Sequence, residues 1–229
     1  MKSDFVSRVS HELRTPLSSI KAYVEMLIDG EADDEENRGE FYRIIQNETD
    51  RLSRLIDNIL SISRIESGVV KINGGDLSLT SLIKDAMNVV QPHASAKSIR
   101  MHWQEPPQFF QVHADRDMIF QVMINLPSNA VKYTPANGGV SVSVVVEEHA
   151  GTVKVTVRDT GAGIPEEALP HVFDRFYRAQ SHGKLTKGTG LGLALVKHVV
   201  ETVHGGTVSV SSKVDEGSTF TITRPRVKR

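Results

Sequence analysis

Two long stretches near the start of the chain carry apolar side chains at alternating intervals of three and four residues. The first stretch contains Leu13, Leu17, Ile20, Val24 and Leu27, and the second contains Phe41, Ile45, Leu52, Leu55, Ile59 and Ile62. This spacing predicts two amphipathic helices, each with one heptad-like apolar seam. Glu48 interrupts the second seam, and the polar, acidic segment 29–39 predicts the loop of a helical hairpin.

Two helices alone do not enclose a hydrophobic core. Pairing of two such hairpins into a four-helix bundle does, so residues 1–68 are predicted to form a homodimer. The alternative is a monomeric hairpin whose seam packs on the rest of the chain.

The pattern changes after a junction at residues 68–75. Helices are predicted over 81–96, over a segment capped by Asp115 that ends near Tyr133, and after Gly192. Strands are predicted over 99–103, 207–212 and 218–223, and period-two valine patterns predict a hairpin of strands 140–146 and 152–158. Helices interleaved with hairpin strands favour a two-layer α/β sandwich with a mixed sheet over residues 75–229.

Composition narrows the functional classes. The 229 residues carry a formal net charge of −1, without the basic excess typical of nucleic-acid binding, so no nucleic-acid partner is expected. The chain has no cysteine, which excludes disulfides and thiolate metal sites and fits a cytoplasmic protein. No apolar run approaches the ~20 residues of a membrane span, so no membrane contact by this segment is expected. A membrane anchor of the full-length protein would lie outside it.

His11 is a candidate nucleophile on the first helix, in the run Ser-His-Glu-Leu-Arg-Thr-Pro. It lies roughly 150° around the helix from the apolar seam, so its imidazole is predicted to face solvent. Glu12 can accept a hydrogen bond from one ring N–H and leave the other nitrogen free to attack phosphorus. Thr15 shares the face of His11 and can orient a water, while Pro16 is expected to bend the helix. The alternative is that His11 is simply one exposed histidine among nine.

A polar stripe on the helix after Asp115 suggests a cation and phosphate site. Asn125, Asn129 and Lys132 are spaced at i, i+4 and i+7 and share one face beside the apolar stripe. Amide oxygens suit Mg²⁺, and the lysine suits phosphate. A solvated helix face is the alternative.

The segment Asp-Thr-Gly-Ala-Gly directly follows the predicted strand 152–158 and is a candidate base-binding site. Gly161 and Gly163 permit close approach to a flat ligand. Asp159 can accept a hydrogen bond from the exocyclic amine of adenine, whereas guanine presents a carbonyl that it would reject. An ordinary turn at the end of a strand is the alternative.

A second glycine-rich segment, Gly-Thr-Gly-Leu-Gly, opens the helix predicted after Gly192, where backbone N–H groups can bind phosphate. Its residues are Gly188, Thr189, Gly190, Leu191 and Gly192. The polar stretch 180–187 before it is a candidate lid over a nucleotide. Phe176 and Tyr177 can anchor that lid and Arg178 can reach a γ-phosphate, whereas Phe173 is expected to pack in the core.

Together these stretches resemble the histidine kinases of two-component systems. Residues 10–17 resemble the family's H box, 125–135 the N box, 159–163 the G1 box, 173–178 the F box and 188–192 the G2 box, all in family order. The resemblance implies a dimerisation and phosphotransfer domain over 1–68 and an ATP-binding domain of the histidine kinase/gyrase-like ATPase type over 75–229. It implies an ATP-dependent kinase that phosphorylates its own His11.

The resemblance also implies roles and partners. Asn129 is the residue associated with Mg²⁺, Asn125 lies near the phosphates, Tyr133 packs against the nucleotide and Asp159 binds the adenine amine. The partner is the receiver domain of a response regulator, whose aspartate takes the phosphoryl group from His11. Glu12 and Thr15 form an acidic-x-x-Thr pair that also supports dephosphorylation of the regulator.

One residue departs from the family pattern. Pro127 stands between Asn125 and Asn129, where the family usually has an apolar helix former, and is expected to kink or locally unwind the helix. The competing interpretation ends the helix near Leu126 and builds the site around the proline.

Two rival functions remain: a gyrase- or chaperone-like ATPase and a dimeric scaffold that only binds nucleotide. The ATPases place a glutamate where this chain has Asn125, which is a poor base for activating water. They also lack an acceptor histidine helix. The set of His11, Glu12 and Lys132 argues against the scaffold, whereas Pro127 keeps it open.

Overall fold

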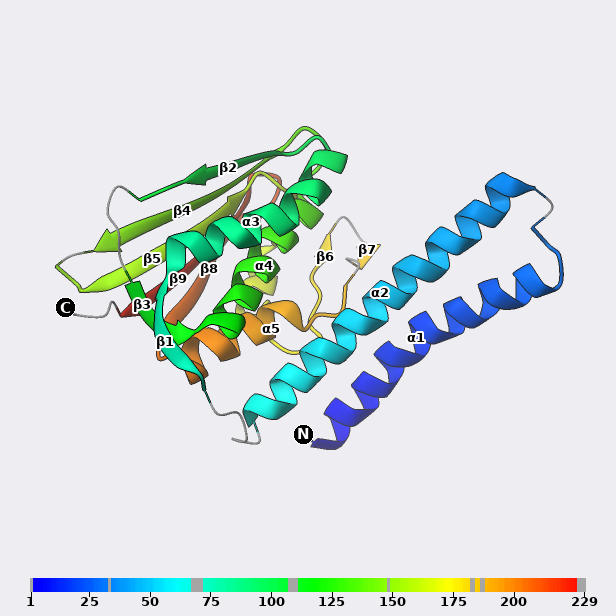
Figure 1. Ribbon diagram of the computed structural model, residues 1–229, viewed down its shortest axis with the longest axis horizontal. Helices are drawn as coiled ribbons and strands as arrows, with labels where there is room; N and C mark the ends of the chain where they lie inside the picture. Colours follow the sequence, from blue (N-terminus) through cyan, green and yellow to red (C-terminus); the bar gives the residue numbers. More distant parts are fainter. Residues whose placement is uncertain are drawn as a thin grey trace. The chain divides into compact units, whose positions relative to one another are not determined.

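The computed structural model describes residues 2–32, 34–66, 72–106, 111–147, 149–181, 184–185 and 188–225 (Figure 1). The chain divides into two compact units, residues 1–64 and residues 65–229. None of the helices in the described ranges is long and apolar enough to cross a membrane.

The first unit is an antiparallel pair of helices, α1 (Lys2–Ile28) and α2 (Glu35–Glu66) (Figure 1). The rings of Tyr23 and Phe41 meet edge to face across the pair, with centroids 5.1 Å apart. The loop is shorter than the predicted 29–39, because α2 already begins at Glu35. Asp34 accepts a hydrogen bond from the Asn37 backbone N–H at 2.7 Å, and acidic side chains in the first turn favour the helix start.

The helical hairpin buries only part of its apolar surface. Leu55 and Ile62 are each 1% exposed, whereas Leu17 on the predicted seam of α1 is 58% exposed and Val24 is 38% exposed. Ile56 and Leu60 on α2 are exposed as well. A single copy of the hairpin therefore leaves these apolar side chains in contact with water. Their burial against another surface would be favourable.

The second unit is a two-layer α/β sandwich, which confirms the predicted fold class. Its five-stranded sheet has the order β2-β4-β5-β9-β8, in which only β2 and β4 pair in parallel. The strands are β2 (Arg100–Gln104), β4 (Gly139–Glu147), β5 (Thr152–Asp159), β8 (Thr207–Lys213) and β9 (Gly217–Pro225). Helices α3 (Leu79–Ala96), α4 (Arg116–Tyr133) and α5 (Gly192–Lys197) lie against one face of this sheet (Figure 1).

The core lies between these helices and the sheet. Valines that alternate along β4 and β5 point into it, as the period-two pattern predicts. The side chains with less than 2% exposure in this unit include Ile83, Val90, Val112, Val122, Leu126, Val140, Val142, Val153, Leu191 and Leu195.

Several short elements were not predicted. Strand β1 (Gly74–Ser78) pairs antiparallel with β3 (Gln111–Asp115), and β6 (Gln180–Ser181) pairs with β7 (Lys184–Leu185). A 3₁₀ turn, η1 (Glu166–His171), follows β5, and α5 continues as a π-helix, η2 (His198–Val203). The glycine-rich β1 has no apolar alternation, so its sequence carries no strand signal.

Helix α4 matches its predicted bounds and runs unbroken through Pro127, which is buried. The Asp115 carboxylate caps it by accepting hydrogen bonds from the N–H groups of Asp117 and Met118, each at 3.1 Å. The competing interpretation, in which the helix ends near Leu126, is therefore wrong, and the expected local unwinding is absent from α4.

Candidate active site

His11 lies on the solvent side of α1, as the helical pattern predicts. Within the described residues its ring makes no hydrogen bond and no ion pair. The Thr15 hydroxyl donates a hydrogen bond to the His11 backbone carbonyl at 3.3 Å, one turn earlier in the same helix. The hydroxyl proton is therefore used within the helix and does not reach the His11 ring. The imidazole is thus exposed and available to a ligand or a partner.

Glu12 faces the second helix of the hairpin. Its Oε2 lies 3.6 Å from Nη2 of Arg51, and Nη1 of the same arginine lies 3.4 Å from Oε2 of Glu48. The expected hydrogen bond between the His11 ring and Glu12 is not among the contacts of the described part of the hairpin. Arg51 was not predicted from the sequence, although the interruption of the apolar seam at Glu48 was a signal that a cation lies nearby.

In the second unit, Asn125 and Asn129 meet the start of α5. A Cβ placed on Gly192 would lie 3.0 Å from Oδ1 of Asn125 and 4.0 Å from Nδ2 of Asn129. The buried Nδ2 of Asn125 has no hydrogen-bond partner in the described residues, so the amide is available to an acceptor such as a phosphate oxygen.

The chemistry of these side chains fits Mg²⁺ held together with phosphate. The described residues contain no group of three or more His, Cys, Asp or Glu side chains that could hold a metal ion on its own. A hard cation at this site would therefore depend on amide oxygens and on phosphate oxygens of the ligand, which matches the way Mg²⁺ usually binds.

Lys132 and Tyr133 lie at the end of α4, against the second glycine-rich segment. The Lys132 ammonium donates to the Tyr133 hydroxyl at 2.8 Å and lies 4.5 Å from the centre of that ring. A Cβ on Gly188 would lie only 2.5 Å from Nζ of Lys132. The glycine therefore lets the backbone pass directly beside the cation that is the candidate phosphate ligand.

The segment that begins at Phe173 is tied to the same glycine-rich segment. Arg178 donates from Nη1 to the Gly188 carbonyl at 3.1 Å, and the Phe176 N–H donates to the Gly190 carbonyl at 2.9 Å. Gly190 has φ +68°, and a Cβ there would lie 2.7 Å from Cα of Phe176. The Thr189 hydroxyl accepts from the Leu191 N–H at 3.4 Å.

Phe173 meets Phe220 of β9 edge to face, as expected of a core residue. Most of the predicted lid, residues 180–187, lies outside the described residues or has undescribed side chains.

Asp159 lies at the end of β5 with 4% of its surface exposed. Its Oδ1 accepts hydrogen bonds from the backbone N–H groups of Gly161 at 2.8 Å and Ser218 at 3.2 Å. Burial raises the pKa of this carboxyl, and the two backbone hydrogen bonds oppose that rise. Its Oδ2 makes no hydrogen bond within the described residues, so one oxygen of a fixed carboxylate is left for a ligand.

The two glycines after Asp159 leave no room for a side chain. A Cβ on Gly161 would lie 2.6 Å from the Tyr133 carbonyl oxygen, and one on Gly163, which has φ +68°, would lie 2.0 Å from the Lys213 carbonyl oxygen. The Ala162 N–H donates to the Tyr133 carbonyl at 3.2 Å. Gly161 and Ala162 therefore pack directly on the end of α4, so the Asp159 turn lies against the backbone of Tyr133, whereas Gly163 packs on Lys213.

Two family models match the chain, each on one of its two parts. The His Kinase A (phospho-acceptor) domain matches residues 1–68. The model described as histidine kinase-, DNA gyrase B- and HSP90-like ATPase matches residues 114–228. The chain belongs to the sensor histidine kinase family.

Relatives with known names support this membership. The chain is 36% identical to the sensor histidine kinase WalK of Bacillus subtilis (strain 168) over 98% of its own length and 36% of that protein. It resembles the solved histidine kinase ThkA in complex with the response regulator TrrA, with 27% identity and a TM-score of 0.75 over 99% of this chain and 63% of that one.

Full-length ShkA, solved in complex with AMPPNP, is 26% identical and has a TM-score of 0.70 over 99% of this chain and 46% of that one. The chain spans roughly a third of the length of the curated relatives that it matches.

Lys97 is a structural residue beside the candidate site that was not predicted from the sequence. Its ammonium donates to the carbonyls of Val131 at 2.7 Å, Lys132 at 3.1 Å and Thr134 at 2.6 Å. These are carbonyls that the end of a helix leaves unpaired, so Lys97 caps α4 beneath Lys132 and Tyr133. The contact spans 34 to 37 residues of sequence, and no local pattern indicates it.

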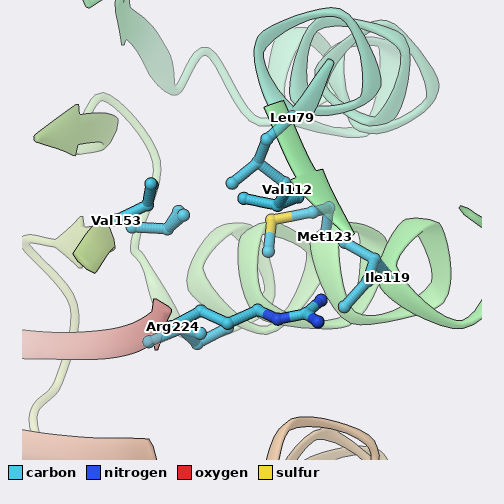
Figure 2. Close-up of a pocket in the computed structure, with 8 residues that line it drawn as sticks. Leu79, Val112, Ile119, Met123, Val153 and Arg224 are labelled. Atoms are coloured by element: carbon cyan, nitrogen blue, oxygen red, sulfur yellow. The ribbon is translucent and has the colours of Figure 1, made fainter. Parts of the chain in front are cut away.

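A small apolar pocket lies elsewhere, between the sheet and the helices (Figure 2). It is lined by Leu79, Val112, Ile119, Met123, Val153, Val155, Ile222 and Arg224. None of these belongs to the predicted site, and the lining is that of a hydrophobic core. The Arg224 guanidinium at its edge donates to the His113 carbonyl, which ties β9 to the β1–β3 ribbon.

Proposed function

We propose that this chain binds ATP and transfers its γ-phosphoryl group to His11. The observation that carries the proposal is that one chain holds both an exposed His11 in a phospho-acceptor domain and a glycine-walled site of Asp159, Asn129 and Lys132 in an ATPase domain. The proposed domain limits are 1–68 for dimerisation and phosphotransfer and 75–229 for ATP binding.

Different side chains are proposed to bind the base and the phosphates of the nucleotide. Oδ2 of Asp159 accepts a hydrogen bond from the exocyclic amine of adenine, and Tyr133 packs against the nucleotide. Lys132 and Arg178 bind phosphate oxygens, and the backbone N–H groups of the segment Gly188–Gly192 line the phosphate path. Gly161 and Gly163 keep the turn below the base free of side chains.

Asn129, with Asn125 near the phosphates, is the proposed contact for Mg²⁺. When bound, this ion supplies positive charge that offsets the charge of the triphosphate. The protein's own part is to hold the amide oxygens and Lys132 on one face of α4, where their spacing is fixed by the helix.

In the transfer step a neutral ring nitrogen of His11 attacks the γ-phosphorus. An N–P bond forms, the P–O bond to ADP breaks, and its electron pair leaves with ADP. The ring keeps the N–H of its other nitrogen and gains a positive charge, which the Glu12 carboxylate stabilises by accepting a hydrogen bond from that N–H.

The proposed partners are a second copy of the chain and the receiver domain of a response regulator. The exposed apolar stripe of the hairpin, with Leu17 and Val24, supports pairing into a four-helix bundle. The complex of ThkA with TrrA supports a receiver aspartate as the next acceptor of the phosphoryl group.

A regulator phosphatase activity is proposed from the same hairpin. Thr15 would turn its hydroxyl away from the His11 carbonyl to orient the attacking water. Thr15→Ala is therefore expected to keep autophosphorylation and lose most phosphatase activity, and equal loss of both would assign Thr15 to the helix alone.

The test of the proposed function is incubation with γ-labelled ATP and Mg²⁺. We expect label on the protein that is lost in acid and survives alkali, as for a phosphoramidate, and that moves to a receiver domain when one is added. ATP turnover without labelled protein would instead indicate a gyrase-like ATPase. Tight ATP binding with neither turnover nor label would indicate a nucleotide-binding scaffold.

A further inference from the structure

A cluster of three charges links the two helices of the hairpin beside His11. Arg51 of α2 places Nη1 at 3.4 Å from Glu48 and Nη2 at 3.6 Å from Glu12 of α1. The three side chains are 19% to 27% exposed, whereas the surface pair Lys21–Glu25 is 75% and 58% exposed. The cluster is therefore screened less by solvent than an ordinary surface ion pair.

Glu48 occupies a position that the helical pattern reserves for an apolar residue, between Ile45 and Leu52. A half-buried carboxylate there is costly unless a cation pairs with it. Arg51 is that cation, one turn further along the same helix, and the bond to Glu48 fixes one end of its guanidinium. The other end then points across the hairpin toward Glu12.

A guanidinium presents its N–H groups in a rigid, planar arrangement, so one arginine can form ion pairs with two carboxylates at once. With Oε2 of Glu12 engaged by Arg51, the second carboxylate oxygen makes no hydrogen bond and no ion pair within the described residues. That oxygen is available to the ring N–H of His11, the neighbouring residue. Without Arg51, the Glu12 and Glu48 carboxylates would lose the cation that they share, and nothing in the cluster would hold Glu12 in its present orientation.

We propose that Arg51, anchored by Glu48, is a positioning residue that holds the Glu12 carboxylate in place for phosphorylation of His11. This inference rests on the proposed function, because Glu12 matters only if His11 accepts the phosphoryl group. Arg51 makes no hydrogen bond or ion pair with His11 within the described residues, so its proposed effect is exerted through the orientation and charge of Glu12.

The experiment is a double-mutant cycle on the autophosphorylation rate at saturating Mg²⁺-ATP, with Arg51→Met and Glu12→Gln. Arg51→Met alone is expected to slow labelling about tenfold or more, while ATP affinity stays unchanged, since misplacement of a proton acceptor costs rate rather than binding. In the Glu12→Gln background, the same change is expected to alter the rate less than about twofold. Equal fold-losses in both backgrounds would overturn the proposal, because a merely structural arginine acts independently of Glu12.

Control variants separate position from charge. Arg54→Met removes an exposed arginine of the same helix, which donates to the Asp50 carbonyl at 3.2 Å, and is expected to leave the rate unchanged. Arg51→Lys keeps a charge without the planar guanidinium and is expected to restore only part of the rate.

If Arg51→Met does not fold, as judged by helicity and oligomeric state, Glu48→Gln takes its place in the cycle. It is expected to slow labelling severalfold only while Glu12 is present, and an unchanged rate would overturn the proposal. A wild-type protein without any label refutes the proposed function itself, whereas normal labelling of Arg51→Met refutes only the role of Arg51.

Discussion

The helical hairpin and the ATP-binding domain differ in how far their candidate functional groups are exposed and held in place. The hairpin leaves Leu17 and Val24 exposed, and the imidazole of His11 has no partner in the described residues. The ATP-binding domain closes its core around Val122 and Val142, and it holds Asp159 with two backbone hydrogen bonds. Under the proposed function, the acceptor His11 has to remain accessible to both a nucleotide and a regulator, whereas selective nucleotide binding needs groups that are fixed in advance.

The largest expected effect concerns the exposed apolar stripe of the hairpin. Leu17→Glu combined with Val24→Glu places two charges on the exposed apolar stripe, which a dimer would bury. We expect the dimer dissociation constant, measured by sedimentation, to rise at least about a hundredfold, a loss of roughly 3 kcal/mol. Ser18→Glu, an exposed polar position of the same helix, is the control and should change little. A monomeric wild type, or a double variant that still dimerises, would contradict the four-helix bundle.

The next effect tests how rigid the glycine-walled site is. Gly163→Ala would place a Cβ 2.0 Å from a backbone oxygen, so we expect a loss of roughly 3 kcal/mol or more in unfolding free energy. Gly151 has a similar φ of +62°, but a Cβ there would meet nothing within 4 Å, so Gly151→Ala should lose only the ~1–2 kcal/mol of left-handed strain. Thermal unfolding of both variants measures the difference. Equal losses would show that the turn after Asp159 adapts to a side chain.

A smaller effect concerns base selectivity. Asp159→Asn is expected to weaken ATP binding by about 1–3 kcal/mol, the cost of a lost charge-assisted hydrogen bond at a buried site. The new amide can turn its NH₂ toward a guanine carbonyl, so the preference for ATP over GTP should shrink in calorimetric titrations. Asp117→Asn, in the exposed first turn of α4, is the control. Unchanged ATP affinity would reduce Asp159 to a turn residue.

The pH dependence of ATP binding follows from the same carboxyl. Because burial raises the pKa of Asp159, protonation begins above the ordinary range of an aspartate as pH falls. The protonated form no longer accepts from the adenine amine as an anion. ATP affinity of the wild type should therefore fall on acidification, and Asp159→Asn should lack that component.

The smallest effect concerns Pro127, the departure from the family pattern. In a helix interior proline removes one hydrogen bond, here to the Met123 carbonyl, at a cost of roughly 3 kcal/mol. Pro127 is buried, however, so the larger leucine must also fit, which costs roughly 1–3 kcal/mol. We expect Pro127→Leu to raise the melting temperature slightly and to strengthen Mg²⁺-ATP binding or autophosphorylation.

Pro127→Ala restores the N–H without added volume and is the matched variant. Neutral or harmful results for both substitutions, in melting temperature and in ATP affinity, would show that the site is adapted to the proline.

Local patterns predicted those elements whose sequence repeats with a period or begins with a cap. Helix α4 was placed by Asp115 and its apolar stripe, and β4 and β5 by alternating valines. The start of α2 was placed too late because charged residues around Gly39 resemble a loop, while the Asp34 cap decides the helix start.

Contacts between distant segments could not be predicted. The three bonds of Lys97 to the end of α4 and the pairing of Arg51 with Glu12 join residues with no shared periodicity. The π-helix after α5, in which Val199 and Val200 are buried, likewise has no residue signal that indicates it.

The most direct test of the central claim is label mapping in wild type and His11→Gln, with ATP affinity measured in parallel. We predict one phosphorylated residue, His11, in the wild type, and no label in His11→Gln at unchanged ATP affinity, because the acceptor lies outside the nucleotide-binding residues. Label retained in His11→Gln, or mapped to another residue of the wild type, would contradict this claim.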